Sequence, residues 1–145
     1  MEVYTIGFTR RTAEDFFETL KRAGIRRLVD VRLHNSSQLA GFAKQADFPY
    51  FLRAIAGIEY VHEPLLAPTQ DILACYRKQG GSWEEYASRF LALLAERRVE
   101  EAIPCSLLEG PAVLLCSERT ADQCHRRLIL EYLNARWGGI QAVHL

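Results

Sequence analysis

The chain has 145 residues, of which 49% are hydrophobic and 25% charged, and its 18 Lys and Arg are matched by 18 Asp and Glu. A formal charge of zero excludes a global electrostatic surface for nucleic acid or membrane, so any anion must be bound by a local cluster of positive groups. No apolar run reaches the roughly 20 residues of a membrane helix, and the N-terminus lacks a targeting pattern. We therefore expect a single cytoplasmic domain, residues 1–145, with reduced cysteines and no membrane contact.

Strand and helix patterns alternate along the chain, which is typical of a parallel sheet covered by helices. Short β-rich runs predict five strands, at residues 3–8, 27–33, 58–62, 111–116 and 140–144. Helices are expected after the capping residues Thr12, Asp47, Thr69, Ser82 and Thr120. The third and fourth of these helices form an insertion before the fourth strand, which lets the chain cross the sheet. We predict a three-layer α/β sandwich with five mainly parallel strands in the order 3-2-1-4-5.

Polar residues follow the expected strands where each strand ends. Open parallel sheets bind ligands outside the carboxyl ends of their strands, at the point where the strand order switches direction. In the predicted order this point lies between strands one and four, whose exits contain Thr9 and Ser117. The second strand ends near Arg32, which lies two residues after Asp30 and on the same face. Arg32 is therefore either an anion-binding residue or the salt-bridge partner of Asp30.

The segment CSERTADQCHRR, residues 116–127, is the richest in chemically capable groups. With Thr120 as the helix cap, Cys124, His125 and Arg126 fall in the first turns of the last helix. A helix N-terminus presents N–H groups that favour an anion, and it lowers the pKa of a cysteine. This segment predicts a site for a phosphate-, carboxylate- or nucleotide-like group, including one derived from nucleic acid.

Two sets of residues are expected to share the work of this site. Cys124 or His125 would be the nucleophile or the general acid–base, with Glu118 orienting it. The residues expected to bind the ligand are Thr9, Arg32, Ser117, Arg119 and Arg126. The loop over residues 34–42 could close over the bound group. The sequence specifies no cofactor, leaves a homo-oligomer open, and does not decide whether the protein is an enzyme.

The residues also resemble a known family. The segments that carry the resemblance are YTIGFTRRTAEDFFETLKRAGIRRLVDVR, NSSQLAGFAK, GIEYVHEPLLAPT and LLCSERTADQCHRRLILEYL, and they extend over essentially the whole chain. Together they are similar to the domain-of-unknown-function 488 family, DUF488. The resemblance implies a small bacterial or archaeal cytosolic α/β protein with no established activity. Several positions of the family pattern coincide with the site expected at the carboxyl ends of the strands. These positions are Gly7, Asp30, Arg32, Cys116, Glu118, Cys124, His125 and Arg126. Many relatives have a Pro and an Arg in the loop after VDVR, where this chain reads LHNSSQLAGF.

Two alternative functions remain open. Cys116 and Cys124 could form a thiol redox pair or share a metal with His125, although the C-x7-C-H spacing matches no usual zinc pattern and we predict no metal. A non-catalytic interaction module would instead use the exposed face of the helix expected over residues 83–102, and it would show a large apolar patch there.

Overall fold

The structure is a computed structural model of the chain, and it describes residues 1–34, 41–43, 46–77, 79–117 and 124–145. Five strands form one sheet, and they are β1 (Glu2–Gly7), β2 (Arg27–Asp30), β3 (Glu59–His62), β4 (Ala112–Cys116) and β5 (Gln141–His144). Each pairing of neighbouring strands is parallel. The strands predicted from the sequence are therefore present, although the second ends at Asp30, earlier than expected.

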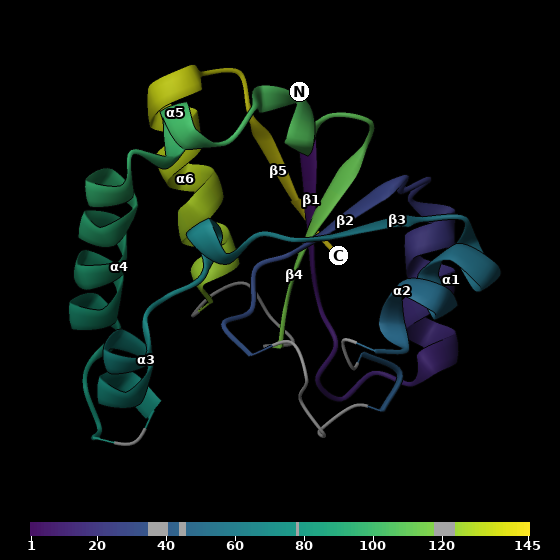
Figure 1. Cartoon of the computed structure of the whole chain (residues 1–145), viewed down its shortest axis with the longest axis horizontal. Coiled ribbons are helices and arrows are strands. Elements are labelled where there is room, and N and C mark those ends of the chain that lie inside the picture. Colours follow the sequence, from purple (N-terminus) through teal and green to yellow (C-terminus); the bar gives the residue numbers. More distant parts are fainter. Residues whose placement is uncertain (35–40, 44–45, 78, 118–123) are drawn as a thin grey trace.

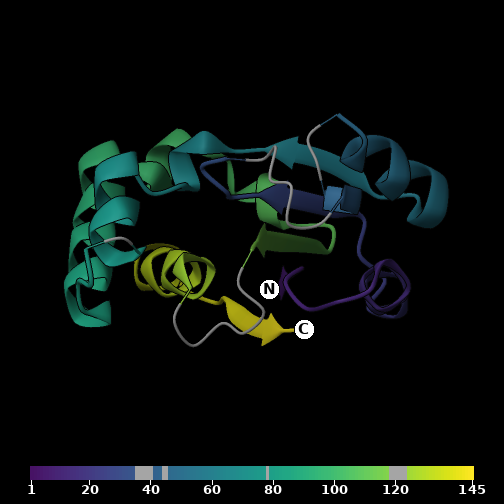
Figure 2. The same ribbon diagram turned by 90° about the horizontal axis from the view of Figure 1, so that it is seen from below.

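Helices cover both faces of this sheet, as Figures 1 and 2 show. The α-helices are α1 (Ala13–Arg22), α2 (Phe48–Phe51), α3 (Gln70–Arg77), α4 (Trp83–Arg97), α5 (Val99–Ala102) and α6 (His125–Trp137). Shorter turns are η1 (Gly41–Ala43), the π-helical η2 (Leu52–Ala56), η3 (Pro64–Leu66) and η4 (Cys105–Leu108). The three-layer α/β sandwich and the helical insertion before β4 are thereby confirmed. In the described part of the chain, no helix combines the length and the apolar character that crossing a bilayer requires.

The strand order is β3-β2-β4-β1-β5, so the predicted order 3-2-1-4-5 was wrong. β4 lies between β1 and β2, and its Val113 is the partner of both Tyr4 and Leu28. All five residues of β4 are buried, whereas the edge strand β5 is largely exposed. The most apolar strand therefore occupies the centre, where both faces and both edges are covered. As a consequence the end of β2 lies beside the end of β4, and Arg32 lines the same pocket as Ser117.

Successive residues of β4 contribute to two separate cores because side chains alternate across a strand. Val113 and Leu115 pack with α1 and α2, whereas Leu114 and Cys116 pack with α4, α5 and α6. In Figure 1, α1 and α2 lie on one side of the sheet and α4 and α6 on the other. The alternation therefore directs the Cys116 side chain toward the face that α6 covers.

The helix starts show which capping predictions were right. Thr12 accepts a hydrogen bond from the backbone N of Asp15 at 3.0 Å, and Ser82 accepts one from Glu85 at 3.1 Å. Asp47 makes no side-chain capping bond. The expected helix over 83–102 is divided into α4 and α5 at Arg98, whose φ is 52°.

The last helix begins later than predicted. Its first residue is His125, with Cys124 in the extended conformation at the N-cap position, and the expected cap Thr120 lies outside the described residues. Cys124 is therefore placed immediately before the helix and not within its first turn.

Candidate functional site

A pocket of about 250 Å³ lies at the carboxyl ends of β2 and β4. The described residues that line it are Arg32, Leu33, His34, Pro68, Leu73, Arg77, Ser117 and His125. They come from the segment after β2, from α3 and the loop before it, from the exit of β4 and from the start of α6. Three residues expected from the sequence to converge, Arg32, Ser117 and His125, thus line one pocket. Among the described lining residues none is an Asp or a Glu.

Arg32 is held in place by a buried ion pair. Its Nε and Nη2 donate to the two carboxylate oxygens of Asp30 at 2.9 and 2.7 Å, and Nη2 also donates to the carbonyl of Ala43 at 2.8 Å. The side chains of Arg32 and Asp30 are 4% and 0% exposed. The guanidinium carbon lies 5.1 Å from the centre of the Phe8 ring. The salt-bridge role left open by the sequence is therefore present, and the positive charge of Arg32 at the pocket wall is balanced by Asp30.

His125 is a neutral, oriented imidazole. Its Nε2 lies 2.7 Å from the carbonyl oxygen of Val31, which only accepts, so the proton is on Nε2 and the lone pair is on Nδ1. Burial lowers the pKa of His125 from 6.5 to about 4, with the charges of Arg77 and Arg126 acting in the same direction and the Val31 carbonyl and Asp30 opposing them. At neutral pH the imidazole of His125 is therefore uncharged, and it contributes only hydrogen-bonding groups to the site.

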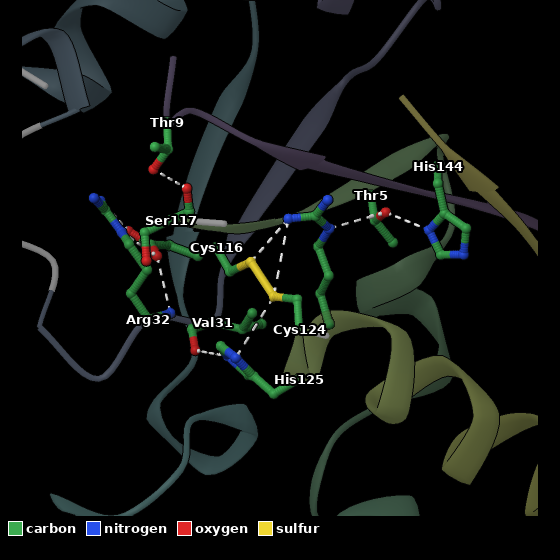
Figure 3. The surroundings of a disulfide bond; sticks show 11 residues. Thr5, Thr9, Val31, Arg32, Cys116, Ser117, Cys124, His125 and His144 are labelled. Carbon is green, nitrogen blue, oxygen red and sulfur yellow. Dashed lines mark hydrogen bonds and ion pairs between the residues drawn. A yellow bond between two sulfur atoms is a disulfide. The ribbon is translucent and has the colours of Figure 1, made fainter. Parts of the chain in front are cut away.

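The structure joins Cys116 and Cys124 in a disulfide, which corrects the expectation that all four cysteines are reduced (Figure 3). The reason is topological: Cys116 faces α6 from the end of β4, Cys124 precedes that helix, and only eight positions separate them. The two cysteines are thus as close as the alternative of a redox pair or a shared metal requires. Cys75 and Cys105 carry free thiols.

Arg126 points at these sulfur atoms. Its Nη1 donates to Cys116 Sγ at 2.9 Å and lies 3.9 Å from Cys124 Sγ, while the side chain is 1% exposed. Its Nε donates to the hydroxyl of Thr5 at 3.2 Å. That hydroxyl in turn lies 2.6 Å from Nδ1 of His144, which is within hydrogen-bonding distance. Arg126 was expected to bind the ligand, but its described contacts are with sulfur and Thr5, and it is not among the residues that line the pocket.

The remaining predicted residues have different positions. Thr9 donates both its backbone N–H and its hydroxyl to the carbonyl of Ser117, and this contact joins the exits of β1 and β4. Thr9 is not among the described lining residues of the pocket. Glu118 and Arg119, together with residues 35–40 of the expected closing loop, lie outside the described residues.

Sequence reasoning missed several residues of the site. Arg77 lines the pocket together with His34, the first residue of the expected closing loop, and Thr5 and His144 form the polar contact next to Arg126. Thr5 had a signal, since it is a hydroxyl residue on the same strand face as the apolar Val3. No sequence pattern indicated Arg77, because its position at the pocket depends on how the inserted helices pack against the sheet.

The ligand atoms of Cys116, Cys124 and His125 all lie within 4.8 Å of one another, as a metal site would require. These are ligand types that zinc accepts, and the Val31 carbonyl orients the ring of His125 as carbonyls do for metal-binding histidines. Metals bind cysteine as the thiolate, however, and the disulfide occupies both sulfurs. The three residues could hold a metal only after reduction, with the guanidinium of Arg126 next to it.

Comparison with known proteins adds one match. The model of the family described as "Domain of unknown function DUF488" matches residues 12–133, which include every described residue of the pocket. No curated protein and no solved structure matches the chain.

Proposed function

The chain belongs to the DUF488 family, whose description names no activity, and from the composition of its pocket we propose that it binds a small anionic ligand at the carboxyl edge of the sheet. One observation carries this proposal. The described lining combines two guanidinium groups, two imidazoles and a hydroxyl, and it contains no carboxylate. Oxyanions are recognised by this kind of donor set.

The volume of the pocket supports a small ligand. At about 250 Å³ it is below the range of roughly 300–1,000 Å³ in which drug-sized molecules are bound. A phosphate, a small carboxylate or a sugar phosphate matches this size better than a dinucleotide does. The location also supports the proposal, because ligands of open parallel sheets bind beside the carboxyl ends of the strands.

Arg77 is the residue most suited to contact the anion. It is exposed at the last position of α3, and a guanidinium has five N–H donors, so it can serve a ligand together with other partners. Arg32 acts differently, because Asp30 already uses two of its nitrogens. The role proposed for Arg32 is to shape the wall of the pocket, with Ser117 supplying a hydroxyl.

The proposal is limited to binding while the disulfide is intact. A sulfur in a disulfide is not a thiolate, so Cys124 cannot be the nucleophile expected from the sequence in this state. The roles expected of Glu118 and Arg119 remain predictions.

The interaction-module alternative receives less support. Within the described residues, the large hydrophobic side chains that are exposed are Met1, Tyr50, Ile55 and Leu65. None of them lies on α4 or α5, where an apolar docking patch was expected.

A titration with inorganic phosphate at constant ionic strength tests the proposal, followed by acetate and adenosine monophosphate to compare the anionic groups. We expect saturable binding by calorimetry, and an affinity lower by at least about 10-fold in Arg77→Gln, since a hydrogen bond to a charged group contributes about 1.5–3 kcal/mol. Arg22→Gln is the matched control, because Arg22 is an exposed arginine of α1 on the opposite face of the sheet. Absence of binding by all three anions, or equal losses in both variants, would refute the proposal.

A further inference from the structure

We propose that Cys116 and Cys124 form a reversible redox pair that is reduced by small thiols, with Cys124 as the sulfur that is attacked and Cys116 as the sulfur that leaves. This inference rests on the contacts of the disulfide and does not depend on anion binding in the pocket.

The first argument is the unequal position of Arg126. Its Nη1 lies 2.9 Å from Cys116 Sγ and 3.9 Å from Cys124 Sγ, so the guanidinium stabilises negative charge on Cys116 more strongly. A cation next to a cysteine favours its thiolate, and a thiol of lower pKa leaves faster in disulfide exchange. Breakage of the bond therefore favours Cys116 as the leaving thiolate.

The second argument is the environment of Cys124. Nδ1 of His125 lies 3.9 Å from Cys124 Sγ, and the Val31 carbonyl keeps the ring proton on the other nitrogen. Nδ1 therefore presents a lone pair to Cys124, and after reduction it can accept a hydrogen bond from the Cys124 thiol. One cysteine of the reduced pair is thus adapted to be a thiolate and the other to be a neutral thiol.

The third argument concerns the size of the reductant. Cys116 and Cys124 are 1% and 2% exposed, so the surface of a folded redox protein does not reach them directly. Their neighbours in sequence, Ser117 and His125, line the pocket of about 250 Å³. Figure 3 shows Ser117 next to Cys116 and His125 next to Cys124, so two residues of the pocket wall adjoin the disulfide. A small thiol that enters the pocket is the reductant that this arrangement admits.

The reaction balances as an ordinary exchange with two thiols. The first thiol loses its proton to solvent, its thiolate attacks Cys124 Sγ, and the bond to Cys116 breaks, which leaves Cys116 as a thiolate beside Arg126. A second thiolate attacks the reductant's sulfur in the mixed disulfide, and Cys124 leaves and takes up the proton of the second thiol. Two electrons have then moved to the cysteine pair, the reductant is released as its disulfide, and one proton has been lost.

The experiment uses the full chain with Cys75→Ala and Cys105→Ala, so that only the pair reacts. The oxidised protein is incubated with glutathione, quenched with acid at short times and digested, and the residue that carries glutathione is identified by mass spectrometry. We expect glutathione on Cys124, and we expect reduction to be faster than global unfolding measured in the same buffer. Glutathione on Cys116 would overturn the assignment of roles, and reduction at the rate of unfolding would show a purely structural disulfide.

A second measurement tests the same roles without the exchange reaction. In this background, Cys124→Ser leaves Cys116 as the single thiol and Cys116→Ser leaves Cys124, and each is titrated by the ultraviolet absorbance of its thiolate. We expect the pKa of Cys116 to be lower than that of Cys124, because the guanidinium of Arg126 is closer to Cys116. Equal values or the reverse order would contradict the proposal. Circular dichroism confirms that both variants are folded.

Discussion

Replacing Arg32 with Met removes the guanidinium that donates two hydrogen bonds to the buried carboxylate of Asp30. Asp30 is 0% exposed and retains the hydroxyl of Tyr60 at 2.6 Å and the backbone N of Arg32 at 3.1 Å, but neither carries a charge. Removing one partner of a buried ion pair costs about 3–5 kcal/mol, since the other charge stays buried without compensation. For a chain of this length such a loss lowers the melting temperature by roughly 10–15 °C.

Urea denaturation of Arg32→Met measures this cost, and Lys21→Met provides the matched control. Lys21 forms an exposed ion pair with Glu18 at 3.5 Å, and pairs of this kind contribute about 0–1 kcal/mol. The double variant Asp30→Asn/Arg32→Met removes both charges and should recover a large part of the loss. A loss below about 1 kcal/mol in Arg32→Met would refute the reasoning, because it would mean that the buried carboxylate does not need its partner.

Two further predictions concern groups around the disulfide. The pKa of His125 is about 4 in the folded protein and 6.5 when unfolded, so the unfolded chain binds the additional proton and stability falls as the pH drops from 6.5 toward 4. Urea denaturation should show a free energy of unfolding about 1.4 kcal/mol lower at pH 5.5 than at pH 7.5. His125→Asn should abolish this loss. The same pH dependence in that variant would contradict the lowered pKa of His125. Thr5→Val keeps the side-chain shape but removes the acceptor of Arg126 Nε, and it should destabilise the fold by about 1–3 kcal/mol, whereas Thr19→Val on α1 should have little effect. Equal losses in the two threonine variants would show that the hydroxyl of Thr5 has no special role.

The pocket and the disulfide are neighbours that share His125, which lines the pocket and also lies 3.9 Å from Cys124 Sγ. Arg77 is a pocket residue, whereas Arg126 contacts the sulfur atoms. Phosphate binding and thiol exchange are separate measurements, so the failure of one proposal leaves the other in place.

Local patterns predicted the five strands and several helix starts, because these depend largely on neighbouring residues in the sequence. The apolar run of β4 and the caps at Thr12 and Ser82 were found for this reason. The beginning of α6 was predicted too early, because a capping pattern at Thr120 does not show which tertiary contacts the following turn will make.

The amino-acid sequence by itself determined the fold class, the family, and the gathering of Arg32, Ser117 and His125 at one edge of the sheet, since parallel strands end at a common edge whatever their order. Only the tertiary structure decided that β4 lies between β1 and β2, that Arg77 joins the pocket, and that Arg126 contacts sulfur. These features depend on contacts between residues far apart in the chain. The physical reason is that local propensities do not distinguish between alternative strand orders or side-chain partners. Burial and the pairing of charges do distinguish between them, and both depend on how the whole chain packs.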